Sequence, residues 1–284
     1  MTTKIIDIHP HIISADTQRY PITPIGGKRS VWSGERPVSF EDLVAGMDAA
    51  GVAKAAIVHS STTYGFNNAY VADVVEAHTD RFTGVFSVDM VAPDVAQTIR
   101  YWASRKLSGL RLFTAGSTQD KQQTFDDPRS FAGWDACADL GIPVAISMRK
   151  EGMPQLMNLI KRYAHVKIIL DHLILPPTEE GPPYAGCQYL FDLAQYGNIY
   201  LKFTTNNVRG STKGKATPET FIGKLVKEFG ANRIAWGSNF PASTATLPEM
   251  LAQAKAVFAF LPQKDQDLIL GGTALTLYPV LADK

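Results

Sequence analysis

Two histidines, His9 and His11, stand one residue apart at the end of a short apolar run near the N-terminus. On an extended strand, side chains two residues apart project to the same side, so the two imidazoles would converge on one point. At the C-terminal end of a strand in a parallel barrel, such a pair can hold a metal ion, an oxyanion or a substrate carboxylate. A histidine pair on a surface edge strand has the same spacing, so other residues must decide between the two interpretations.

Short apolar segments that recur along the chain predict eight strands, at 5–8, 55–58, 83–88, 109–113, 143–147, 166–170, 199–203 and 234–236. Segments with helical spacing of apolar residues lie between and after them, at 40–50, 67–78, 94–105, 129–140, 154–163, 187–195, 218–229, 247–260 and 264–270. Eight alternations predict an α/β fold, a (β/α)8 TIM barrel, with residues 1–284 as a single domain. A doubly wound open sheet is the competitor, but no GxGxxG sequence follows the first strand.

Composition narrows the class of protein and its partners. Hydrophobic residues make up 45% and charged residues 19%, which is typical of a globular protein with a large core. The formal net charge of +1 gives no reason to expect nucleic acid or an anionic membrane as a partner. We expect a cytoplasmic protein, because no run of about 18 apolar residues and no charged-then-apolar leader is present. Cys137 and Cys187 lack CxxC spacing and are interpreted as core thiols.

Polar residues gather where the predicted strands end, and in a barrel these ends form one mouth. Seven of the eight strands contribute: His9 and His11, His59, Arg111, Ser147 with Arg149 and Lys150, Asp171 and His172, Lys202, and Ser238 with Asn239. Each residue alone has an ordinary structural explanation, such as a core histidine or a rim ion pair. Their joint occurrence favours an active site. The long connections at 11–39, 173–186 and 204–217 are predicted to form its walls or lids.

Neighbouring residues on a strand point to opposite faces, and this separates two of the candidates. Asp171 precedes His172, so we expect its carboxylate to point away from the site and to orient the backbone or a loop.

Three motifs carry a resemblance to a known family: DIHPH at 7–11, LDH at 170–172 and WGSNFP at 236–241. Over nearly its whole length the chain resembles the amidohydrolase superfamily. The most similar branch is the amidohydrolase-2 group, which contains 2-pyrone-4,6-dicarboxylate hydrolase and related sugar and muconolactone lactonases. The resemblance implies a barrel hydrolase that opens a small anionic lactone, with a place in aromatic catabolism.

The same resemblance bears on metal use. Metal-dependent members carry a histidine at the end of strand five, where this chain has Ser147 in the sequence AISM. The pyrone dicarboxylate branch also lacks that histidine and works without metal, which implies no essential metal here. The alternative is one divalent zinc ion at His9, His11 and His172, because catalytic zinc takes about three protein ligands.

The family's catalytic aspartate falls on Asn239, whose amide cannot accept a proton from water. In the lactonase hypothesis, the catalytic histidines His9, His11 and His172 polarise the lactone carbonyl and stabilise the oxyanion, while Asn239 orients water. A histidine must then accept the proton of that water. The residues expected to bind the anionic substrate are His59, Tyr64, Arg111, Ser147, Arg149 and Lys202.

Two other functions fit the same pocket. A lyase, hydratase or isomerase acting on an unsaturated carboxylic acid would use a histidine as base and would need no carboxylate at Asn239. A binding protein that keeps an anion pocket is the non-catalytic reading. All three take a small anionic molecule as partner, and the sequence leaves homo-oligomerisation open.

Overall fold

A barrel of eight parallel strands forms the centre of the computed structural model, which describes residues 4–116, 118–119 and 121–283. Each strand pairs with the next in chain order, which confirms the (β/α)8 prediction. The strands are β1 (Ile5–Asp7), β2 (Val52–Val58), β3 (Phe82–Phe86), β4 (Leu107–Phe113), β5 (Val144–Ser147), β6 (Ile168–Leu170), β7 (Ile199–Thr204) and β8 (Ile234–Gly237).

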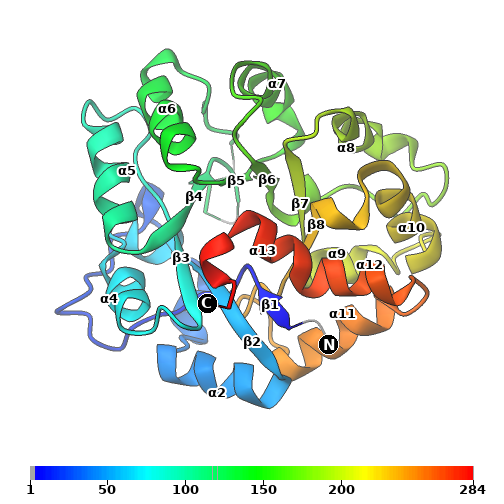
Figure 1. Cartoon of the computed structure of the whole chain (residues 1–284), viewed down its shortest axis with the longest axis horizontal. Coiled ribbons are helices and arrows are strands. Elements are labelled where there is room, and N and C mark those ends of the chain that lie inside the picture. The colour runs from blue at the N-terminus through cyan, green and yellow to red at the C-terminus, as the bar shows by residue number, and fades with distance from the viewer. Residues whose placement is uncertain (1–3, 117, 120, 284) are drawn as a thin grey trace.

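Helices surround the strands, as Figure 1 shows. They are α2 (Phe40–Ala50), α4 (Ala69–Ala77), α5 (Val95–Ser104), α6 (Phe131–Leu140), α7 (Met153–Arg162), α8 (Gln188–Phe191), α10 (Pro218–Phe229), α11 (Leu247–Phe258), α12 (Gln263–Asp267) and α13 (Thr273–Leu277). The predicted helix at 187–195 is divided into α8 and a 3-10 turn, Asp192–Gln195. Short helices interrupt the connections at the barrel mouth: α1 (Val31–Glu35), α3 (Ser61–Tyr64) and α9 (Thr205–Gly210).

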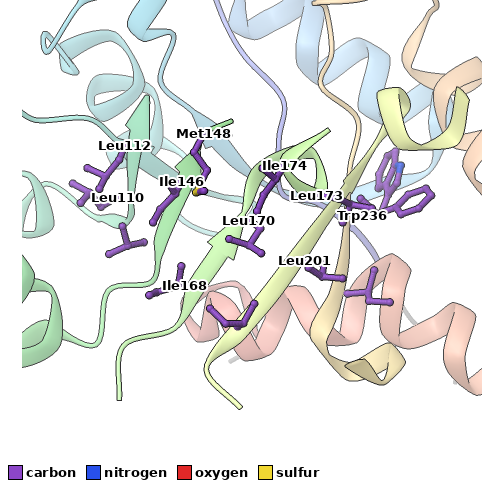
Figure 2. Packing of buried hydrophobic residues seen from close by; sticks show 14 of the residues in the cluster. Leu110, Leu112, Ile146, Met148, Ile168, Leu170, Leu173, Ile174, Leu201 and Trp236 are labelled. Atoms are coloured by element: carbon purple, nitrogen blue, oxygen red, sulfur yellow. The ribbon is translucent and has the colours of Figure 1, made fainter. Parts of the chain in front are cut away.

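Successive side chains along each strand belong alternately to two apolar layers, one on each side of the sheet. Leu110, Ile146, Ile168 and Leu201 belong to the layer between strands and helices, part of which is drawn in Figure 2. Residues of the other parity, such as Ala145 and Ile169, fill the barrel interior together with side chains of α13 and the segment after it. Figure 1 shows α13 lying across the middle of the barrel. One end of the barrel is therefore packed, and polar residues occupy the other.

The seam between β1 and β8 is closed partly by a side chain. Ile8 N–H donates to Trp236 O at 3.2 Å. The Asp7 carboxylate oxygen Oδ1 accepts from the backbone amides of His9 at 2.9 Å and of Ser238 at 2.8 Å. Gly237 allows this close approach, because a Cβ there would lie 2.6 Å from the Cβ of His9. One carboxylate thus fixes the backbone on both sides of the seam.

Two further expectations are tested by the fold. Cys137 and Cys187 are both buried and free, as predicted. Within the described ranges, none of the helices has the length and the apolar character that crossing a membrane requires.

Candidate active site

A cavity of about 460 Å³ opens at the C-terminal ends of the strands. Among the residues predicted from the sequence, its walls contain His11, Arg111, Ser147, Arg149, His172 and Asn239. Each of the three long connections also contributes a wall residue: Trp32, Leu175 and Asn206. The cavity therefore opens at the end of the barrel where the sequence predicts a site, and the three predicted loops contribute to its wall.

Period-two alternation explains which strand residues face inward. Tyr200 and Ile169 fill the barrel interior, and Lys202 and Asp171 follow them by two positions. Asp171 therefore points into the barrel and lines the cavity. This corrects the expectation that its carboxylate points away. The prediction was wrong because it assumed that His172 continues the strand.

Asp171 is the centre of a buried ion cluster. Its Oδ2 accepts from Arg111 Nε at 2.7 Å, and Lys202 Nζ lies 2.7 Å from its Oδ1. Burial alone would raise the pKa of Asp171, but the two cations outweigh burial and hold it below its usual range. Two cations and one carboxylate leave this cluster with a net charge of +1.

Lys202 does not reach the substrate cavity. Its side chain is 0% exposed and is absent from the cavity wall. Burial lowers its pKa, and the neighbouring Asp171 carboxylate opposes that shift and favours the ammonium form. The prediction that Lys202 binds substrate is therefore corrected: its ammonium contacts Asp171, which lines the cavity.

The backbone after β6 makes a left-handed turn that brings His172 into the site. Four consecutive residues, His172 to Leu175, have φ between 48° and 61°. For residues other than glycine this conformation costs about 1–2 kcal/mol each, so surrounding contacts must hold it. Leu173 and Ile174 are buried, and Asn207 Nδ2 donates to the His172 carbonyl at 2.8 Å.

Hydrogen bonds fix the tautomer of His172. The backbone N–H of Thr204 donates to Asn207 Oδ1 at 2.9 Å, which identifies that atom as the amide oxygen. Thr204 Oγ1 lies 3.2 Å from the same oxygen and donates its proton there. With its own proton assigned to that oxygen, Thr204 Oγ1 accepts from His172 Nδ1–H, 2.8 Å away. The lone pair of His172 is therefore on Nε2.

His11 has the same tautomer for a simpler reason. Its Nδ1 lies 2.7 Å from Val58 O, which can only accept, so the proton is on Nδ1 and the lone pair on Nε2. Its ring stacks on Trp32 with centroids 5.2 Å apart. Burial lowers the pKa of His11 to about 3 and that of His172 to about 4, so both are neutral at pH 7.

His9 lies behind the cavity wall. Its ring is 4.9 Å from that of His11 and 5.0 Å from that of His172, centroid to centroid, so the predicted convergence is observed. It is fully buried, and neither ring nitrogen has a hydrogen-bond partner among the described residues. Burial first, and then the Lys202 charge, lower its pKa well below the usual range.

Three predicted substrate-binding residues use their polar atoms elsewhere. His59 Nε2 lies 2.9 Å from Gly65 O, and the Tyr64 hydroxyl accepts from Ser14 N–H at 2.8 Å. Neither side chain is on the cavity wall, which corrects their assignment to substrate binding. Ser147 is on the wall, but its hydroxyl donates to Ala115 O at 2.9 Å.

The inner wall of the cavity contains residues of the types that bind divalent metal ions. Ligand atoms of His9, Asp171 and His172 lie within 4.8 Å of one another, whereas His11, expected as a zinc ligand, is not in this cluster. Three protein ligands are enough for a catalytic zinc. Their charge environment does not suit one, however, because Lys202 and Arg111 already occupy the two oxygens of Asp171. A metal ion bound by these three residues would share the Asp171 carboxylate with both cations.

Solved structures of similar fold cover nearly the whole chain. A candidate 2-pyrone-4,6-dicarboxylic acid hydrolase from Pseudomonas putida has a TM-score of 0.79 at 18% identity, and all of both chains are covered. A zinc-bound amidohydrolase from Burkholderia multivorans has a TM-score of 0.72 at 19% identity, covering 97% of this chain and 99% of that one. The 2,6-dihydroxybenzoate decarboxylase from Rhizobium has a TM-score of 0.70 at 15% identity, covering 99% of this chain and 100% of that one. These likenesses support the barrel fold.

Sequence comparison identifies the family. L-fucono-1,5-lactonase of Burkholderia ambifaria is 26% identical over 211 residues, which cover 73% of this chain and 70% of the lactonase. The sequence profile of the family Amidohydro_2, described as amidohydrolase, matches residues 6–280. The chain therefore belongs to the amidohydrolase family and is an enzyme of the hydrolase type.

Proposed function

We propose that this chain hydrolyses a small anionic lactone or related cyclic ester, of the pyrone or muconolactone type, without an essential metal. The observation that carries the proposal is His172, whose Nε2 lone pair is set by Thr204 on the wall of a cavity that also contains Arg111. A neutral imidazole acceptor beside a guanidinium suits water attack on an anionic ester. The similar lactonase and the similar candidate pyrone hydrolase support this substrate class.

Different residues of the cavity wall bind the carboxylate and the ring of the substrate. Arg149 is exposed at the mouth of the cavity. Arg111 donates from Nε to Asp171, and no described residue accepts a hydrogen bond from the terminal nitrogens of Arg111. These two guanidinium groups hold the substrate carboxylate. Trp32 and Phe113 provide aromatic surface for a planar ring.

Hydrolysis then needs one water molecule between Asn239 and His172. The Asn239 carboxamide orients the water, and His172 Nε2 accepts a proton as the water oxygen attacks the lactone carbonyl carbon. The ring C–O bond breaks, and the departing oxygen takes that proton from His172. The products are the ring-opened acid and a neutral histidine ready for the next cycle.

The oxyanion is stabilised by cations rather than by the imidazoles. Neutral His11 and His172 carry lone pairs on Nε2 and cannot donate from that atom, so this proposal assigns the oxyanion to cations and not to the imidazoles expected from the sequence. The Arg111 guanidinium, within a buried cluster of net charge +1, supplies the opposing charge. We further propose that residues 1–284 act as one catalytic domain.

The test is turnover of pyrone carboxylates, muconolactone carboxylates and sugar lactones in the presence of a chelator. We expect hydrolysis by the wild-type chain and a fall in kcat of about 10²–10⁴-fold in His172→Gln, with little change in KM. His165→Gln, at an exposed histidine, is the matched control and should behave as wild type. Hydrolysis of none of these lactones would refute the proposal, and conversion of an unsaturated acid without ring opening would favour the lyase alternative.

A further inference from the structure

The surroundings of Asp171 Oδ1 combine metal-ligand chemistry with a fixed cation. His9 Nδ1 lies 3.9 Å from this oxygen, and ligand atoms of His9, Asp171 and His172 form a compact group. Lys202 Nζ lies 2.7 Å from the same oxygen. The lysine and any metal ion bound by these three residues would therefore share one carboxylate oxygen.

The group lies at the inner wall of the cavity and is largely buried, so its charges are weakly screened. The side chains of His9, Asp171 and Lys202 are all 0% exposed. Both ring nitrogens of His9 lack a hydrogen-bond partner within the described part of the chain, and they lie beside Asp171 Oδ1, whose near neighbour is the Lys202 ammonium. Buried polar atoms of this kind normally have a partner, so their meeting at one point marks a place built for a bound group.

We propose that the Lys202 ammonium is a built-in cation that stands in for a divalent metal ion and keeps such an ion out of a latent site formed by His9, Asp171 and His172. Lys202 neutralises Asp171 from below the cavity, and Arg111 does so from the cavity side. The positive charge that a metal ion would bring to the site is thereby supplied by side chains.

The size of the exclusion follows from the distances. A zinc ion takes carboxylate oxygen at about 2.1 Å. Bound to Asp171 Oδ1, it would lie within about 4.8 Å of Lys202 Nζ, the sum of that distance and 2.7 Å. With an effective dielectric constant of about 20, repulsion between these charges weakens metal binding by about 10⁵-fold. Even much stronger screening would leave a loss that is readily measured.

The test is zinc binding by the full chain and by Lys202→Met, followed by titration calorimetry and by the melting temperature with and without Zn²⁺. We expect Lys202→Met to bind one Zn²⁺ per chain at least 100-fold more tightly than wild type and to melt at higher temperature when zinc is added. The matched control is Lys54→Met: Lys54 is a largely buried strand lysine paired with Asp283 at 3.0 Å, outside the cavity. It should bind no more zinc than wild type.

Two further variants locate the new site and its cause. Lys202→Met combined with His172→Ala should lose the gained affinity, and Lys202→Arg, which keeps the charge, should not gain it. Tight one-to-one zinc binding by the wild-type chain would overturn the proposal, whether or not the variants fold, and its absence supports it. A folded Lys202→Met or Lys202→Gln protein with no gain would also overturn it. These measurements use no substrate, so they stand apart from the test of lactone hydrolysis.

Discussion

Four histidines, of which His9, His11 and His59 are buried and His172 is partly buried, should make this protein lose stability in mild acid. Burial lowers the pKa of His59 and that of His172 to about 4 and that of His11 to about 3, and it holds the pKa of His9 well below its usual range. In the unfolded chain a histidine titrates near pH 6.5. Between pH 6.5 and about 4 the unfolded chain therefore binds more protons than the folded chain. The stabilisation is fully present above pH 6.5 and is lost as the pH falls through this range.

The loss of unfolding free energy follows from the pKa difference of each histidine. One pKa unit corresponds to about 1.4 kcal/mol, so each such histidine removes about 2 kcal/mol of unfolding free energy between pH 7 and pH 5. Four of them remove on the order of 8 kcal/mol, which is comparable with the whole stability of a typical domain. His59 is the cleanest to replace, because it lies off the cavity and Gln can keep a donor toward Gly65 O.

The assay is urea unfolding of wild type and His59→Gln at pH 7 and pH 5, followed by tryptophan fluorescence. The loss of unfolding free energy between the two pH values should be smaller by about 2 kcal/mol in the variant. His165→Gln, which replaces an exposed histidine, should lose as much as wild type. An equal loss in His59→Gln and wild type would refute the claim that a buried neutral His59 contributes to acid sensitivity.

The catalytic assignment yields three further predictions. Thr204→Val removes the acceptor for His172 Nδ1–H and should lower kcat about tenfold with little change in KM, measured by steady-state kinetics on a lactone that the wild type hydrolyses. An unchanged kcat would mean that another group holds the tautomer of His172. Asn239→Asp adds a carboxylate acceptor to the cavity wall and should raise kcat at pH 7 on the order of tenfold, whereas a fall would indicate that the amide N–H is needed. Arg149→Met should raise KM about 10- to 100-fold at unchanged kcat for carboxylate-bearing lactones, and an equal effect on an uncharged lactone would contradict its role in binding the anion.

The barrel could be predicted because its determinants are local. Each strand is a short apolar segment and each major helix has regular apolar spacing, so counting eight alternations was sufficient. Strand ends also placed Arg111, His172 and Asn239 on the cavity wall. These inferences need only the periodicity of the chain and the rule that parallel strand ends share one face.

The errors concern features that depend on distant contacts. The left-handed segment from His172 to Leu175 contains no glycine, so the sequence gives no signal for this conformation. Buried side chains and a hydrogen bond from Asn207, on another segment, hold it in place. Because that run turns His172 inward, both it and Asp171 reach the site, which simple alternation does not allow. Lys202 was misassigned for a related reason: strand alternation predicts that its side chain points into the barrel, but not that the side chain is buried beneath the cavity wall.

The Asp7 carboxylate ties the order of synthesis to the appearance of activity. It joins the backbone of His9 to that of Ser238, and the ribosome adds β8 long after β1. A nascent chain that has not yet emerged as far as position 238 has no partner for this bond, so its first strand lacks the neighbour that completes the ring. The histidines that follow β1 are thus set in place only after β8 has been added, and a chain truncated before β8 would lack the ordered histidine pair as well as β8.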